Sequence, residues 1–148
     1  MALAVPLSRF TSRVGGGSAF FVRRTMPAQI LKRADVARVL TEWSTGRMTS
    51  IEVLSWADSR YPSDDVDYED WEGDDSVTNE VLGALDMLDM NLALPEDAPI
   101  YLQFLSTPVG QYSSGSAEFQ RRLAAIDYES RRAQLRDTMP YAPFCGVS

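Results

Sequence analysis

Carboxylates are concentrated in one short stretch of this chain, and a carboxylate can bind a metal ion, transfer a proton or attract a cationic protein. Eight of the twelve residues from Asp64 to Asp75 are acidic, and two aromatic residues stand among them. The ten residues are Asp64, Asp65, Asp67, Tyr68, Glu69, Asp70, Trp71, Glu72, Asp74 and Asp75. They lie within sixty consecutive residues, 61–120, that contain no Lys, Arg or His. No residue nearby in the chain neutralises the charge, so the carboxylates repel one another.

A calcium site of the helix–loop–helix type is the first chemistry that this stretch suggests. Such a loop needs carboxylates at alternate positions, glycine at the sixth position and glutamate at the twelfth. Counted from Asp65, the acids Asp67 and Glu69 fit the alternation, but the sixth residue is Asp70 and the twelfth is Ser76. The pattern fails at both positions, so we expect no dedicated metal site. Weak binding of divalent cations by the clustered carboxylates stays open.

Proton transfer is the second possibility, because paired carboxylates can act as general acid and general base. That chemistry requires a carboxyl group whose pKa is shifted by burial or by a close partner. Adjacent acids in a polar loop should be solvated, and so should Asp86 and Asp89 on an expected helix. The chain has no His, and it lacks the common nucleophile, phosphate-binding, dinucleotide-binding and zinc-protease motifs. We therefore expect no catalytic residues, no cofactor and no enzymatic activity.

Attraction of a cationic protein is the third possible role of the carboxylates, and it agrees best with the net negative charge of the chain. The chain carries 14 basic and 21 acidic residues, a net charge of −7. Residues 1–25 contain four arginines and no acid, so residues 26–148 alone carry a net charge of −11. A domain with this net negative charge should repel phosphate backbones, which argues against nucleic-acid binding. We expect a basic protein partner, met by the acidic stretch with Tyr68 and Trp71, since aromatic residues are frequent among binding hot spots.

The cysteine content and the hydropathy of the chain indicate its cellular compartment. Cys145 is the single cysteine, so no intramolecular disulfide can form, and a reducing compartment is indicated. No apolar run approaches the roughly 18 residues that a membrane-spanning helix needs. We expect a soluble, cytoplasmic protein that does not bind membranes.

The elements that would position the acidic stretch are helices. Apolar residues recur at helical spacing in five ranges, which predicts helices over 31–44, 49–61, 77–90, 95–105 and 116–138. Thr49 and Glu52 form a capping-box pattern at the start of the second helix, and Gly46 is suited to end the first. Residues 63–75 show no apolar period and are expected to form an acidic loop between helices two and three. The fold prediction is an all-α, single-domain bundle of about five helices.

Residues 1–25 differ in composition from the rest of the chain. They contain no acid, and Gly15, Gly16 and Gly17 interrupt them. A start codon placed upstream of the true start at Met26, a targeting leader and a disordered arm are all compatible with this composition. We expect the acidic helical domain to comprise residues 26–148, with residues 1–25 outside the fold.

The roles of Trp71 and of the C-terminal arginines can each be interpreted in two ways. Trp43 and Trp56 lie on apolar helical stripes and should be core residues, whereas Trp71 either anchors the acidic loop or contacts a partner. The acidic loop could also pair with cations of the last expected helix, in the same chain or in a second copy. Those cations are Arg131, Arg132 and Arg136. The corresponding alternative function is a structural, self-associating helical domain, with a homo-oligomer where pairing is between copies.

Residues from about 36 to 105 resemble the small helical bacterial immunity proteins of the colicin and contact-dependent inhibition type. The resemblance rests on the segments Trp43–Ala57 (WSTGRMTSIEVLSWA) and Asn79–Asp89 (NEVLGALDMLD), the acidic aromatic loop after Tyr61 and the LPED turn at residues 94–97. It covers about half of the chain. The resemblance implies a stoichiometric inhibitor that neutralises a nuclease toxin by occupying its basic substrate channel. On this interpretation the acidic loop is the binding surface.

Overall fold

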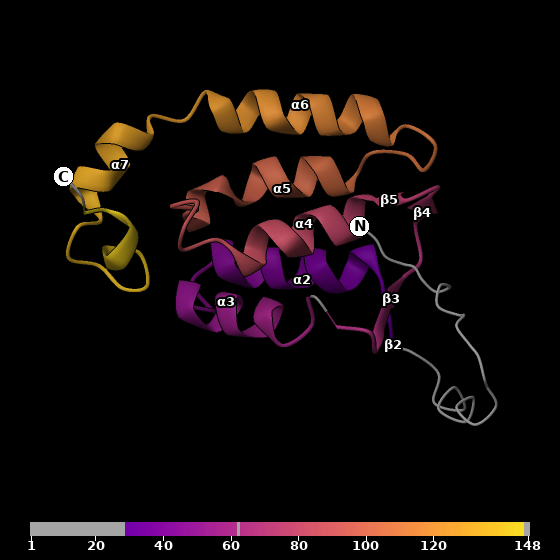
Figure 1. Ribbon diagram of the computed structural model, residues 1–148, viewed down its shortest axis with the longest axis horizontal. Coiled ribbons are helices and arrows are strands. Elements are labelled where there is room, and N and C mark those ends of the chain that lie inside the picture. Colours follow the sequence, from indigo (N-terminus) through magenta and orange to yellow (C-terminus); the bar gives the residue numbers. More distant parts are fainter. Residues whose placement is uncertain (1–28, 62, 147–148) are drawn as a thin grey trace, which may run out of the picture.

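The computed structural model describes residues 29–61 and 63–146, and it is built mainly from helices stacked side by side (Figure 1). Six α-helices occur in this part of the chain: α2 (Arg33–Ser44), α3 (Ser50–Asp58), α4 (Val77–Asp86), α5 (Ala98–Leu105), α6 (Tyr112–Ala124) and α7 (Tyr128–Gln134). Two short 3-10 helices, η3 (Pro95–Asp97) and η4 (Ala142–Phe144), precede α5 and follow α7. The interpretation of residues 1–25 as a leader or arm falls outside the described residues.

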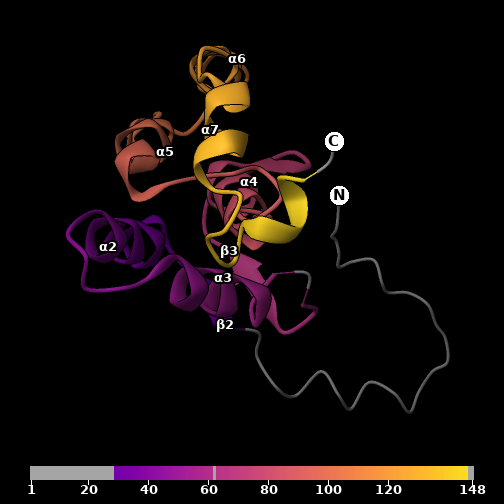
Figure 2. The ribbon, with the colours of Figure 1, turned by 90° about the vertical axis from the view of Figure 1, so that its left-hand side faces the viewer.

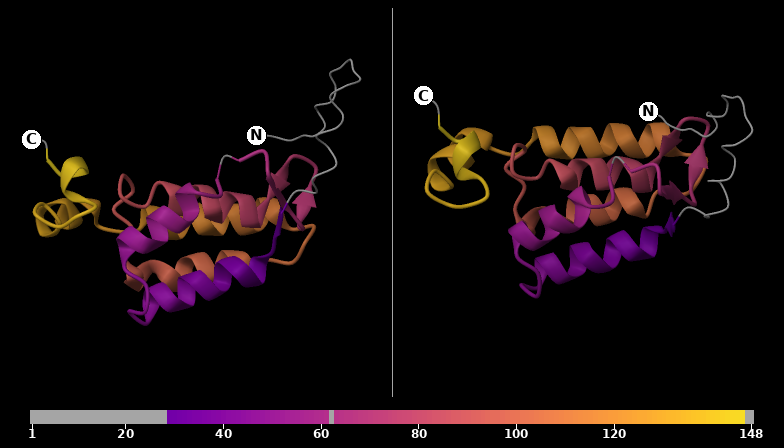
Figure 3. Two further views of the ribbon diagram at one scale, coloured as in Figure 1. Left: turned by 90° about the horizontal axis from the view of Figure 1, so that it is seen from below. Right: turned by 60° about the horizontal axis from the view of Figure 1, so that its bottom comes forward.

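Four short strands correct the all-α prediction. They are β2 (Gln29–Leu31), β3 (Val66–Tyr68), β4 (Trp71–Glu72) and β5 (Asp75–Ser76). β2 pairs with β3 in parallel, and β4 pairs with β5 antiparallel. The strands gather at one end of the molecule, while α7 and η4 lie at the opposite end (Figure 3). The fold is mostly helical with small strands, and the acidic stretch forms three of those strands instead of a loop alone.

The α2–α3 pair follows the sequence signals closely. Thr49 accepts a hydrogen bond from the Glu52 backbone at 3.1 Å, and the Glu52 carboxylate accepts one from the Thr49 backbone at 2.9 Å, which confirms the capping box. Gly46 has φ +83°, a left-handed conformation that glycine adopts without steric cost. α2 begins at Arg33 and not at residue 31, because Leu31 belongs to β2.

Buried aromatic side chains join three of the helices. Trp43 of α2 meets Tyr101 of α5 edge-on at 6.5 Å, and Tyr101 meets Phe119 of α6 at 5.4 Å. Phe104 of α5 stacks on Phe119 at 4.5 Å. Seen from the end, α4 lies near the centre of the section with α2, α3 and α5 around it (Figure 2). Trp43 is therefore a core residue as predicted, whereas Trp56 is only half-buried, with the Arg60 guanidinium 4.7 Å from its ring.

The expected last helix is two helices, which is a second correction. α6 already begins at Tyr112, ahead of the start predicted at residue 116. The helix ends at Ala124, and α7 starts after Asp127, whose side chain accepts a hydrogen bond from the Ser130 backbone at 3.0 Å. An aspartate in this capping position begins a new helix and competes with continuation of the old one. The described residues therefore hold six α-helices where the sequence predicted about five.

Candidate functional site: an acidic surface on β3, β4 and β5

Asp70 is the residue around which the acidic stretch is organised. Its carboxylate accepts hydrogen bonds from the Arg33 Nε at 2.8 Å, from the Ser76 hydroxyl, and from the Thr78 backbone and hydroxyl at 3.1 and 3.0 Å. Burial alone would raise the pKa of Asp70, but the hydrogen bonds from Ser76, Arg33 and Thr78 outweigh it and hold that pKa below its usual value. The residue is only 3% exposed. Asp70 was predicted to contact a partner, and its position instead makes it an internal anchor.

Arg33 is the cation that pairs with the acidic stretch within the described residues. Besides Asp70, its guanidinium donates to the backbone carbonyl oxygens of Leu105, at 2.8 Å, and Thr107. The Arg33 backbone N–H donates to the Glu69 carboxylate at 3.2 Å. One arginine at the start of α2 thus holds the acidic stretch against the end of α5.

Glu72 is also turned inward. It is half-buried, and its carboxylate accepts a hydrogen bond from the backbone N–H of Tyr112, the first residue of α6, at 3.1 Å. A carboxylate at a helix N-terminus satisfies a free backbone donor and faces the positive end of the helix dipole. Glu72 therefore helps to position α6. Like Asp70, it was predicted to contact a partner and instead makes a contact inside the fold.

The other six carboxylates remain exposed, and together they form what we call the acidic surface. Its members are Asp64, Asp65, Asp67, Glu69, Asp74 and Asp75. Within the described residues, none of the six is in an ion pair. Asp67 lies on β3 and Asp75 on β5, while the other four lie in the turns before and between the three strands, at the strand end of the molecule (Figure 3). Their negative potential is consequently directed into solvent.

The two aromatic residues of the stretch contact each other. The rings of Tyr68 and Trp71 meet edge-on with centroids 5.6 Å apart, and the Trp71 indole N–H donates to the Asp67 carboxylate at 2.7 Å. Tyr68 also packs against the hydrophobic core, and burial, with smaller effects from Tyr61, Asp67 and Asp70, raises the pKa of its hydroxyl. Both rings are half-buried. Tyr68 fixes the stretch to the core, and Trp71 keeps part of its surface open between acidic neighbours.

Arg131 does not pair with the acidic surface. Its guanidinium makes a bidentate ion pair with Asp97, with distances of 2.6 and 2.8 Å, and donates to the Leu92 carbonyl oxygen at 3.0 Å. The prediction that Arg131 pairs with the acidic loop of the same chain is therefore wrong. Arg132 and Arg136 are exposed, and neither is in an ion pair with a residue of the described ranges.

Asp86 is a site that the sequence interpretation missed. It was expected to be solvated, but it is half-buried on α4, with one carboxylate oxygen shielded from water. Burial, a hydrogen bond with Asp58 and the charges of Asp58 and Asp89 raise the pKa of Asp86 to about 6. Asp58 lies 28 positions earlier in the chain, at the end of α3, so no local pattern relates the two carboxyl groups.

The acidic residues do not assemble a metal centre in the described part of the chain. There, no group of three or more His, Cys, Asp and Glu side chains is arranged to hold a metal ion. Nor is any helix of the described ranges long and apolar enough to cross a membrane. Comparison with known proteins finds no matching family, curated sequence or solved structure.

Proposed function

We propose that this protein is a non-enzymatic, acidic binding protein that neutralises a basic protein partner through its acidic surface. The observation that supports it is the exposure of six carboxylates, none of them ion-paired within the described ranges, at one end of the molecule. Trp71 contributes apolar area among these charges. An acidic surface with a partly open aromatic ring complements a cationic protein surface, and opposite charges speed association.

The inhibitor that best fits this surface is of the immunity type, directed at a nuclease-like toxin. A nuclease channel is cationic because it receives phosphates, so six carboxylates held on a preformed segment can occupy it in place of substrate. Asp70, Arg33 and Tyr68 hold the acidic surface in position before binding, which lowers the ordering cost of association. Such an inhibitor acts by occupation and needs no catalytic group.

The test is a capture experiment from the source cell, with the full chain as bait at about 0.05 M and about 0.5 M salt. We expect one basic protein to be retained at low salt and lost at high salt. The triple variant Asp64→Asn, Asp65→Asn, Asp74→Asn should bind the captured protein at least about tenfold more weakly in calorimetry. A control with the same net charge, Glu96→Gln, Glu129→Gln, Asp137→Asn, should bind as the parent does.

Two results would count against this function. Equal weakening in both triple variants would show that only net charge matters. Recovery of the bait alone would favour the alternative function, a self-associating helical domain, in which the exposed Arg132 and Arg136 of one copy pair with the acidic surface of another.

A further inference from the structure

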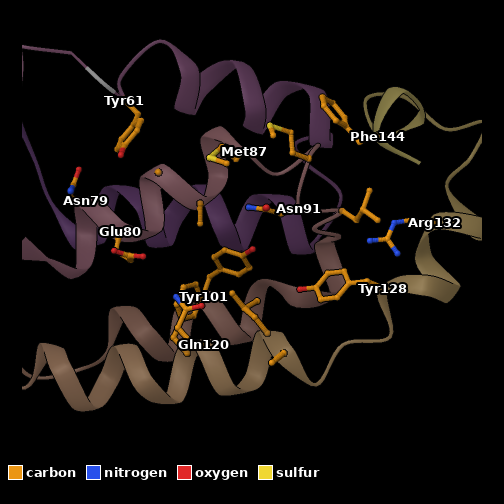
Figure 4. A pocket seen from close by; sticks show the side chains of 17 residues that line it. Tyr61, Asn79, Glu80, Met87, Asn91, Tyr101, Gln120, Tyr128, Arg132 and Phe144 are labelled. Carbon is orange, nitrogen blue, oxygen red and sulfur yellow. The ribbon is translucent and has the colours of Figure 1, made fainter. Parts of the chain in front are cut away.

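A groove runs between α4 and α6, on the face of the molecule shown in Figure 4. Its volume is about 650 Å³, and it contains none of the six residues of the acidic surface. The groove exists because α4 and α6 each pack on α5, so that α5 lies behind the space between them. The buried rings of Tyr101 and Phe119 form its floor.

The middle of the groove carries apolar side chains that are open to solvent. Met87 and Met90, three positions apart in the turn that follows α4, are 41% and 52% exposed. Leu123 lines the opposite wall on α6, and Phe144, 41% exposed, lines the end near the C-terminal segment. Exposed methionines with aromatic neighbours are common on surfaces that bind apolar partners, because the thioether chain is flexible and polarisable.

The two ends of the groove carry opposite charges. Glu80 lies at one end, where its carboxylate accepts a hydrogen bond from the Tyr112 hydroxyl at 2.9 Å. Arg132 lies at the other end, beyond Met87 and Asn91 (Figure 4). It is exposed and takes part in no ion pair with the residues that the structure describes. An occupant that is positive at one end and negative at the other would complement both.

We propose that this groove binds an amphipathic α-helix of a partner protein, with the N-terminus of that helix toward Glu80 and its C-terminus toward Arg132. A helix carries partial positive charge at its N-terminus and partial negative charge at its C-terminus, which matches the two ends. It also satisfies its own backbone hydrogen bonds, whereas methionine, leucine and aromatic side chains offer few partners to an extended peptide. Apolar residues at helical spacing would then pack on Met87, Met90 and Leu123.

The experiment uses two synthetic peptides of equal composition, each with one apolar helical stripe. One has Lys in its first turn and Glu in its last, and the other has these turns exchanged. The full chain is labelled with ¹³C at the methionine methyl groups, and binding is followed by NMR. We expect the first peptide to shift the Met87 and Met90 signals and to leave those of Met48 and Met139 in place. The second should bind about threefold to fivefold more weakly, as for exposed charge pairs.

Matched variants locate the contact. Met90→Lys should weaken binding of the first peptide about tenfold, as for a central interface residue. Met139→Lys changes a methionine that is 61% exposed and does not line the groove, and it should have no effect. Arg132→Glu should abolish the preference between the two peptides. In the triple variant of Asp64, Asp65 and Asp74, affinity should be unchanged, which separates this groove from the acidic surface.

Several results would overturn the proposal. These are equal affinity for both peptides in the parent chain, shifts confined to Met48 or Met139, and loss of binding in the acidic-surface variant. A mass that rises with concentration and falls to the monomer in Met90→Lys would assign the groove to a second copy of this chain. Tighter peptide binding after removal of residues 1–28 would assign it to the chain's own N-terminal segment.

Discussion

Asp70 and Asp74 carry the same carboxylate four positions apart, yet their surroundings give them different roles. Asp70 is buried against Arg33, Ser76 and Thr78, and every one of these contacts lies inside the fold. Asp74 is exposed and belongs to the acidic surface. A buried charge with hydrogen-bonding partners is costly to lose, whereas a solvated charge on a surface contributes little to stability.

Replacing Asp70 should therefore destabilise the protein, and replacing Asp74 should not. Asp70→Asn leaves the Arg33 guanidinium without its counter-charge, and we expect the free energy of unfolding to fall by about 2–4 kcal/mol. Asp74→Asn should change it by less than about 0.5 kcal/mol. Urea unfolding of both variants near neutral pH measures the difference. Equal effects would mean that Asp70 is not the anchor of the acidic stretch.

Asp86 should make stability depend on pH in the opposite sense to Asp70. Its pKa is raised to about 6 from the ordinary value of 3.8, so between these values the folded chain binds more protons than the unfolded chain. Stability should consequently decrease as pH rises through this window. Asp86→Asn should remove that decrease and, because the site is partly solvated, raise stability at pH 7 by about 1 kcal/mol or less.

Thermal unfolding between pH 4 and pH 8 measures this effect, with Asp137→Asn as the control, since Asp137 is exposed. The control should keep the slope of the parent chain. If Asp86→Asn kept this slope as well, the Asp86 carboxyl would not be the group that causes it.

One buried ion pair joins α7 to η3. Arg131 of α7 binds Asp97 of η3 through two hydrogen bonds, and both side chains are buried. α7 has seven residues, too few for a helix to be stable by itself. This pair, together with the buried side chains of Leu135 and Tyr141, therefore holds the C-terminal segment beside the groove.

Neighbouring arginines provide a matched test of that dependence. Arg131→Gln leaves Asp97 buried without its counter-charge and should lower the free energy of unfolding by about 3–5 kcal/mol. Arg132→Gln alters an exposed side chain and should cost less than about 0.5 kcal/mol. Chemical denaturation followed by circular dichroism compares the two. The pair would have no structural importance if both variants unfolded alike.

Elements with strong local signals were predictable from the sequence, and elements that depend on distant contacts were not. The stripe of Val36, Val39, Leu40 and Trp43 is buried as its spacing predicts, and the capping box at Thr49 starts α3. β3, β4 and β5 are too short to show an alternating pattern, and β3 exists through its pairing with β2. The start of α6 was hidden by its Ser- and Gly-containing first turn, where Glu72 supplies a partner from another segment.

The charge of the candidate site could be predicted from the sequence, but its division into surface and interior could not. Eight carboxylates appear equivalent in the chain, because only the fold brings Arg33 to Asp70, 37 positions away. The same limit hid the groove, whose floor and walls come from α4, α5, α6 and the C-terminal segment. Net charge is a sum over residues and needs no structure, whereas burial depends on which segments meet.

β2 and β3 run parallel, so α2 and α3 must connect them before the two strands can meet. Contacts between distant residues cost loop-closure entropy, and helical turns form from local contacts much sooner. We therefore expect a newly made chain to form its helices first and to organise Asp64–Asp75 late. Its charge is present from synthesis onward, but the shape that a partner would recognise arises only once the rest of the chain has folded.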